Sequence, residues 1–211
     1  STSGTVSGNK SDDFEGASFN TNVWASWTSG MTQGNSCGVI SGTKSLIFNG
    51  SGVRSIQTIP LNTSAGGNIS FNYRRSLCEY ADAGEGIYVF YSTNNGTTWT
   101  QIQYFFTSLT VTQAAVMTIP VGAQGSNVIF KIQQSINSGI SFDYWVVDDF
   151  LISSGISNSI IFTPPSGTTA AAGSTNVTAQ IVTTGLSNGT YNLFAYVTNN
   201  DPVNPVLTIP V

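Results

Sequence analysis

The chain contains no histidine, which removes several kinds of active site at once. Ser/His/Asp and Cys/His triads need an imidazole base, and most transition-metal sites use imidazole ligands. Catalysis would therefore need carboxylates, as in glycoside hydrolysis. Away from the acidic residues near residues 12–15 and 148–149, the dense acidic group is Glu79, Asp82 and Glu85. We interpret it as a solvated loop balanced by arginines 74 and 75, because nothing else in the sequence indicates a cleft. The sequence predicts a protein that is not an enzyme.

Charge is also scarce, at 8% of residues, with six Lys and Arg against ten Asp and Glu and a formal net charge of −4. Such a chain cannot neutralise a run of phosphates or bind an acidic membrane surface. No apolar run approaches the roughly 18 residues of a membrane span. We therefore expect no nucleic acid partner and no membrane insertion. The lack of a signal peptide and of an initiator Met favours a mature secreted product or an excised fragment.

Only two cysteines are present, Cys37 and Cys78, and they lack the close spacing of a zinc or thiol redox motif. The sequence leaves open whether they meet in the fold. Ser, Thr, Asn and Gly are abundant, and a surface of hydroxyls and amides is common in secreted β-rich proteins and adhesins. This composition predicts a secreted or cell-surface location.

Patterns typical of β-strands are plentiful. Residues 84–99 read as a β-hairpin, with an aromatic and β-branched run at 87–91, a tight turn at Asn95-Gly96 and a returning strand at 97–102. Residues 68–74 alternate polar with apolar side chains, as a half-exposed strand does. No apolar pattern of 3.6-residue period persists for ten residues, so the chain is predicted to be all-β.

Several motifs, taken in order along the chain, resemble the subrepeats of reelin and the related jelly-roll domains of bacterial extracellular proteins. They are Asp13-Phe14-Glu15, Cys37-Gly38, Leu46-Ile47-Phe48, Arg54, Cys78, the segment from Gly84-Glu85-Gly86 to Trp99, and Trp145-Val146-Val147-Asp148-Asp149-Phe150. The tail, with Gly185 to Tyr191 and Asn200 to Pro205, looks like an immunoglobulin-like module that commonly accompanies such jelly rolls. The closing Asp-Asp motif is also shared with carbohydrate-binding modules.

The sequence predicts three regions: a disordered or linker segment at 1–11, which is small and polar, a β jelly roll at 12–154, and, after turn-forming residues near 153–158, a small Ig-like β-sandwich at 155–211. The resemblance implies that this last module normally runs a few residues further. It also implies a secreted protein, in which Cys37 and Cys78 form a disulfide.

A calcium ion is the cofactor that the resemblance implies. In such jelly rolls a structural Ca²⁺ lies where the opening Glu, the closing Asp and backbone carbonyls converge. The hypothesis assigns it to Glu15 and Asp148, with Asp13, Asp149 and the carbonyl of Lys44. Hard oxygen ligands and no soft ligand nearby favour Ca²⁺ over zinc or copper. The alternative is an acidic strand end at the surface.

Aromatic residues suggest a glycan groove, although most large aromatics in a sandwich belong to its core. Alternation separates Tyr88 from Ile87 and Val89, so Tyr88 is expected on the open face beside Arg75 and Lys131. A tyrosine ring can stack on a pyranose while Arg and Gln bond its hydroxyls.

We therefore expect a non-catalytic extracellular module, a building block of a bacterial adhesin or filament. It would act through contacts with neighbouring β-modules, a protein surface or a glycan. The alternative is an accessory binding domain of a secreted protease or glycosidase.

Overall fold

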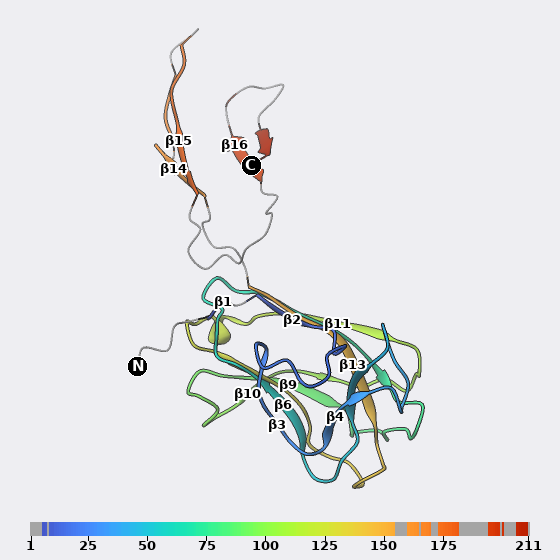
Figure 1. Cartoon of the computed structure of the whole chain (residues 1–211). Helices are drawn as coiled ribbons and strands as arrows, with labels where there is room; N and C mark the ends of the chain where they lie inside the picture. Colours follow the sequence, from blue (N-terminus) through green and yellow to red (C-terminus); the bar gives the residue numbers. More distant parts are fainter. Residues whose placement is uncertain are drawn as a thin grey trace.

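The structure is a computed structural model, and it describes residues 6–7, 9–154, 160–164, 166–169, 173–181, 194–198, 200 and 206–210. Residues 10–154 form two antiparallel sheets packed face to face as a jelly-roll β-sandwich (Figure 1). The described elements are all strands except one 3-10 turn, η1 (Val121–Ala123). The predicted all-β class is confirmed. Among the described residues, no helix is long and apolar enough to cross a membrane.

The first sheet has five strands in the order β10-β9-β12-β6-β3. Their bounds are Thr100–Phe105, Ile87–Ser92, Ile129–Gln134, Arg54–Thr58 and Trp24–Trp27, respectively. The second sheet has the order β11-β8-β13-β5-β4, and β2 also pairs with β13. These strands are Gln113–Thr118, Gly67–Arg75, Trp145–Ser154, Ser45–Phe48, Met31–Gly34 and Lys10–Asp12. A short parallel pair joins β1 (Val6–Ser7) to β7 (Leu61–Asn62).

The predicted hairpin is confirmed, but its second strand begins at Thr100, three residues later than the predicted start at residue 97. Asn95 and Gly96 have φ angles of 56° and 80°, and the Thr97 amide donates to the Asn94 carbonyl at 3.2 Å. Both central residues thus adopt the positive φ that a type I′ turn requires. The strand resumes only at Thr100, opposite Tyr91, because residues 97–99 belong to the turn segment.

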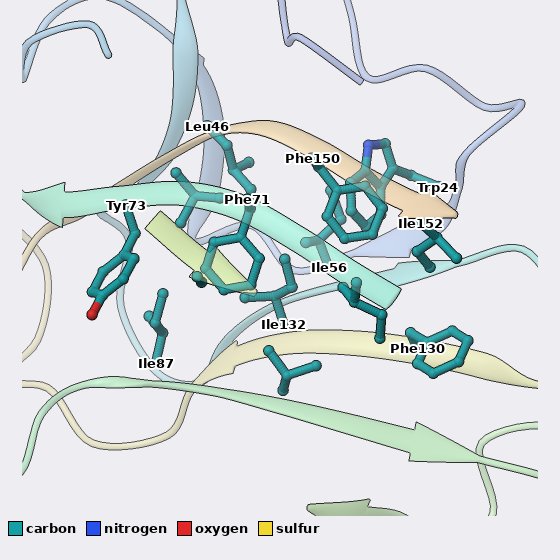
Figure 2. Packing of buried hydrophobic residues seen from close by; sticks show 14 of the residues in the cluster. Trp24, Leu46, Ile56, Phe71, Tyr73, Ile87, Phe130, Ile132, Phe150 and Ile152 are labelled. Atoms are coloured by element: carbon teal, nitrogen blue, oxygen red, sulfur yellow. The ribbon is translucent and has the colours of Figure 1, made fainter. Parts of the chain in front are cut away.

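Side chains from both sheets fill the space between them (Figure 2). Trp24, Ile56, Ile87, Phe130 and Ile132 come from the five-stranded sheet, and Leu46, Phe71, Tyr73, Phe150 and Ile152 come from the six-stranded sheet. Each of these side chains is buried. Because side chains alternate along a strand, the residues on either side of an inward-pointing residue point to the outer face of the same sheet.

The chain joins the sandwich earlier than predicted. Residues 10 and 11, which were assigned to the linker, form β2 with Asp12, and Lys10 and Ser11 pair with Ile152 and Leu151. The backbone ladder of β13 provides partners for β2, a stabilisation that the polar sequence does not reveal.

Four strands lie beyond residue 155. They are β14 (Ile160–Thr163), β15 (Thr178–Ile181), β16 (Phe194–Thr198) and β17 (Val206–Pro210), and β14 pairs with β15 and β16 with β17. The residues between these pairs lie largely outside the described ranges. The Ig-like module and the exact boundary at residue 155 remain predictions.

Cys37 and Cys78 form the expected disulfide, with 5.0 Å between their Cα atoms. It joins the segment after β4 to the segment after β8. The Leu77 amide also donates to the Cys37 carbonyl at 2.9 Å, so the two segments are held by both bonds.

Arg54 is completely buried at the start of β6 and closes one end of the sandwich. Its guanidinium donates to Gln134 Oε1 at 2.8 Å and to the carbonyl oxygens of five residues, Phe48, Gly50, Gly139, Phe142 and Asp143. Burial lowers the pKa of Arg54, but an arginine still remains charged at neutral pH. One cation therefore fixes the loops at 49–53 and 135–144.

Replacing both cysteines with serine should lower the free energy of unfolding by about 4 kcal/mol, because the bond closes a loop with a sequence separation of 41 residues. Urea denaturation of the double variant and the oxidised parent measures the difference. A loss below about 1 kcal/mol would mean that the unfolded chain gains little freedom without the bond.

Arg54→Met should lower the free energy of unfolding by about 3 kcal/mol or more, because several buried carbonyl oxygens lose their donor. Arg75→Met is the matched control. Arg75 is half-buried and donates to the Ser108 carbonyl at a long 3.5 Å, so its loss should cost about 1 kcal/mol. Equal losses in the two variants would contradict the special role of Arg54.

Candidate functional site

The outer face of the five-stranded sheet carries the aromatic and amide side chains that the core excludes. On β9, Ile87 and Val89 are buried while Tyr88 and Phe90 are half-buried on the opposite face. Residues directly opposite each other on antiparallel strands share a face, so the strand register identifies the other side chains of this surface.

One row of side chains crosses all five strands. Lys131 lies opposite Phe90 on one side and opposite Gln57 on the other, Phe90 lies opposite Gln101, and Gln57 lies opposite Ser26. We call Ser26, Gln57, Lys131, Phe90 and Gln101 the Lys131 row. With a strand spacing near 4.8 Å, it is about 19 Å long.

A second row runs beside the first, about 7 Å away along the strands. Gln133 lies opposite Tyr88 and Ser55, and Tyr88 lies opposite Tyr104. We call Ser55, Gln133, Tyr88 and Tyr104 the Tyr88 row. The Tyr88 ring contacts those of Tyr104 and Phe90, with centroid distances of 4.6 and 5.8 Å. The two rows together form a platform of aromatic rings edged by amides.

Two local features bring further rings to this platform. Gly86 leaves room for the Tyr104 ring, since a Cβ on Gly86 would lie only 2.6 Å from Tyr104 Cε2. Trp99, at the end of the turn segment, lies over Lys131, and its ring centroid is 4.1 Å from the ammonium. The Phe90 centroid is 4.9 Å from the same ammonium. Lys131 thus contacts two aromatic rings through cation–π interactions.

The structure brings two of the three predicted ligand-binding residues to this face. Tyr88 and Lys131 lie on adjacent strands, in neighbouring rows. The placement of Arg75 beside them is wrong, because Arg75 ends β8 in the other sheet. Its guanidinium lies over the rings of Tyr80 and Phe106. Whether any of these residues binds a ligand remains a prediction.

The predicted calcium ligands do not form one cluster. Glu15 accepts hydrogen bonds from the Thr43 hydroxyl and from the amides of Thr43 and Lys44, at 2.5, 2.8 and 3.0 Å. These bonds, with that of the Thr43 hydroxyl the largest cause, lower the pKa of Glu15. The Lys44 ammonium donates to the carbonyl oxygens of Glu15 and Gly16, at 3.3 and 2.6 Å. The oxygens of this part of the predicted site thus accept from Thr43 and Lys44, and oxygens of this kind are the ligands that Ca²⁺ prefers.

Asp148 lies on the other side of the same loop. Its buried carboxylate accepts from the Ser41 amide at 3.1 Å and the Ser45 hydroxyl at 2.7 Å, and burial raises the pKa of Asp148. Asp149 accepts from the Ser41 hydroxyl at 2.9 Å. The opening and closing motifs are therefore joined through residues 41–45 by hydrogen bonds.

Asp13 and Asp149 share a pocket of about 340 Å³ next to this network. Asp12 also lines the pocket, and its carboxylate accepts from the Trp24 indole at 2.6 Å and the Phe14 amide at 3.0 Å. Because burial raises the pKa of Asp12, these two donors are needed to hold its charge. The five predicted ligand residues thus divide among three neighbouring environments.

A different acidic cluster appears at the Arg54 end. Carboxylate oxygens of Asp82, Glu85 and Asp143 lie within 4.8 Å of one another, the one such grouping of three among the described residues. Burial raises the pKa of Glu85, whereas for Asp143 hydrogen bonds with Ser138 and Glu85 outweigh burial and lower the pKa. Arg54 is a buried cation that attracts two carboxylates of this cluster, those of Asp143 and Glu85.

We predicted that Arg74 and Arg75 would compensate the charges of Glu79, Asp82 and Glu85. Their side chains instead donate hydrogen bonds to backbone carbonyl oxygens. Arg74 donates to the carbonyl oxygens of Val39 and Thr110, and Arg75 to that of Ser108. Asp143, 58 residues from Glu85 in the numbering, was missed because only the fold brings it there.

The two packed sheets define the molecule as a β-sandwich of the jelly-roll class. More specifically, the chain belongs to the reelin subrepeat B family. The sequence model of that family matches residues 30–153, which are more than half of the chain. The predicted family resemblance is therefore confirmed for the jelly roll.

Several solved structures are similar at low sequence identity. One is described as "Family 16 Carbohydrate Binding Module-2", with 17% identity, a TM-score of 0.43, and coverage of 62% of this chain and 90% of that chain. TmCBM61, solved with β-1,4-galactotriose, has 14% identity and a TM-score of 0.43, covering 66% and 96%. A CBM35 from Paenibacillus barcinonensis has 13% identity and a TM-score of 0.40, covering 66% and 100%. Similarity at this level does not assign a ligand.

Calcium binding remains a prediction, and we expect it at Glu15. A melting temperature measured at calcium a hundredfold above its Kd should exceed that in EDTA by about 5 °C or more, because the ion stabilises only the folded state. Glu15→Gln should remove this difference.

The control is Asp82→Asn, which alters the cluster around Asp143 and should leave the calcium effect intact. An effect removed by Asp82→Asn but not by Glu15→Gln would place the ion at the Arg54 end. An unchanged melting temperature in the parent protein would contradict a structural calcium site.

Proposed function

We propose that the chain is a non-catalytic binding module that holds a glycan on the outer face of its five-stranded sheet. The observation that carries the proposal is the pair of rows, in which aromatic rings on β9 and β10 lie next to amide side chains on the same face of the sheet. A ring can cover the apolar face of a sugar while an amide donates to and accepts from its hydroxyls.

The site is open and its elements are rigid, which suits an extended ligand better than an enclosed small molecule. Three amides, Gln57, Gln101 and Gln133, project from three different strands. Their backbone is held by ladder hydrogen bonds, so little order has to be gained on binding. Because half-buried Tyr88 and Tyr104 lie side by side, they offer a contact surface of about two rings.

Catalysis finds less support at this face, because its strands carry no Asp or Glu. The Asp82, Glu85 and Asp143 cluster lies instead with the loops that Arg54 holds. The Asp82 amide donates to Glu85 Oε2 at 2.8 Å, so a carboxylate of this cluster stabilises the loop that carries it.

We propose a secreted or cell-surface setting, with the module serving in a bacterial adhesin or filament. Service as an accessory domain of a secreted hydrolase is the alternative. The disulfide and the surface rich in hydroxyls and amides support an oxidising, extracellular compartment for both. The sequence of the full protein on either side of residues 1–211 distinguishes them, since further β-modules favour the first and a hydrolase domain favours the second.

Binding on a glycan array tests the proposed function. Tyr88→Ala should lower affinity for any bound glycan by about tenfold, because one stacked ring contributes on the order of 1–1.5 kcal/mol. Tyr80→Ala is the control, since Tyr80 is exposed on the loop after β8 and belongs to neither row. A panel with no bound glycan, or equal losses in the two variants, would contradict a site at the platform.

A further inference from the structure

Lys131 is an unusual residue for its position. It lies in the middle strand of the five-stranded sheet, on the outer face, with only 8% of its surface exposed. Its ammonium faces the rings of both Phe90 and Trp99. In the described part of the chain, no carboxylate or carbonyl oxygen accepts a hydrogen bond from this ammonium. An ammonium has three donors, and ring faces meet only part of its need for a partner.

Four of the other five cations of the described sandwich, all except Lys10, donate hydrogen bonds to oxygen atoms. Arg54 donates to six oxygen atoms, and Lys44 donates to two carbonyl oxygens. Arg74 and Arg75 donate to carbonyl oxygens. Lys131 therefore differs from these four in having rings as its neighbours and a place in the candidate glycan site.

Charge is distributed unequally between the two sheets. The strands of the five-stranded sheet, β3, β6, β9, β10 and β12, contain no Asp or Glu, and neither do the turn segments at 93–99 and 119–128. Asp12, Asp148 and Asp149 belong to strands of the six-stranded sheet. The negative net charge of the whole chain therefore does not describe the strands of this face, on which Lys131 is the central charge.

We propose that the glycan held on this face carries a carboxylate, as a uronic acid does, and that this carboxylate pairs with the Lys131 ammonium. The inference rests on the proposed function and narrows its ligand class. The rings of Phe90 and Trp99 keep water from much of the ammonium, and a charge-assisted hydrogen bond is strong in such surroundings. Burial lowers the pKa of Lys131, and a bound carboxylate would oppose this effect.

A single cation in the row favours one carboxylate per site over a dense polyanion. Gln57 lies opposite Lys131 on β6. Its side chain reaches the turn that precedes Trp99, since a Cβ added to Gly96 would lie 3.9 Å from Gln57 Oε1. Gln57 can therefore bind the hydroxyls of the same sugar residue. Sulfated or phosphorylated polymers, with several charges over this length, would meet no further cation in the Lys131 row.

The experiment compares matched acidic and neutral ligands. Oligogalacturonides, oligoalginates and glucuronic-acid-bearing xylo-oligosaccharides are each titrated before and after methyl esterification, which removes the charge and keeps the sugar ring. The parent protein should bind at least one acidic member about tenfold or more tightly than its ester, since a charge-assisted hydrogen bond is lost. Lys131→Met, which keeps an unbranched side chain without the charge, should bind acid and ester equally, and Lys131→Arg should keep the preference.

Lys10→Met is the matched control, because it removes a cation from β2 in the other sheet and should leave the preference unchanged. Equal binding of acid and ester by the parent would overturn the carboxylate inference and leave the glycan site standing. A preference that persists in Lys131→Met would also overturn it. If the parent binds neither form in any pair, and the wider array is also empty, the proposed function fails and the inference fails with it.

Discussion

The alternation of side chains along β9 is the constraint on which the candidate site depends. Ile87 and Val89 must point inward to fill the space between the sheets, so Tyr88 and Phe90 must point outward. A slip of one residue would expose the core side chains and bury the outer ones, at the cost of the packing seen in Figure 2. The energy that stabilises the sandwich therefore also holds the Lys131 row in register across five strands and the Tyr88 row across four.

Polar networks hold the sandwich together at two places where apolar packing does not. At one end Arg54 gathers the carbonyl oxygens of two loops, and at another place residues 41–45 join Glu15 to Asp148. Both solutions bury charge, and both satisfy it with several short hydrogen bonds. Buried charge is tolerated only under that condition. Such networks fix loop positions more sharply than a hydrophobic contact would, because each bond has a preferred direction.

Much of the fold could be predicted from local pattern, because strands and turns leave periodic traces. The hairpin around Asn95-Gly96 is an example, and the motif order also indicated the family. Cross-sheet placement could not be predicted, since strand order depends on contacts distant in sequence, and Arg75 was misplaced for that reason. Tyr104 shows a subtler limit. The register shift between Gln101 and Gln103 places Tyr104, not Gln103, opposite Tyr88, and simple alternation would exchange the two.

Net charge also proves to be a coarse guide to a binding face. The chain carries a formal net charge of −4, which argues against partners such as nucleic acid that need many cations. Its carboxylates, however, cluster with Arg54 and around the 41–45 loop, where hydrogen bonds and a buried cation compensate them. Electrostatic attraction between exposed groups fades over roughly 10 Å in physiological salt. A ligand on the Lys131 row is therefore governed mainly by the ammonium beneath it and by neutral amides and rings, whatever the sign of the whole molecule.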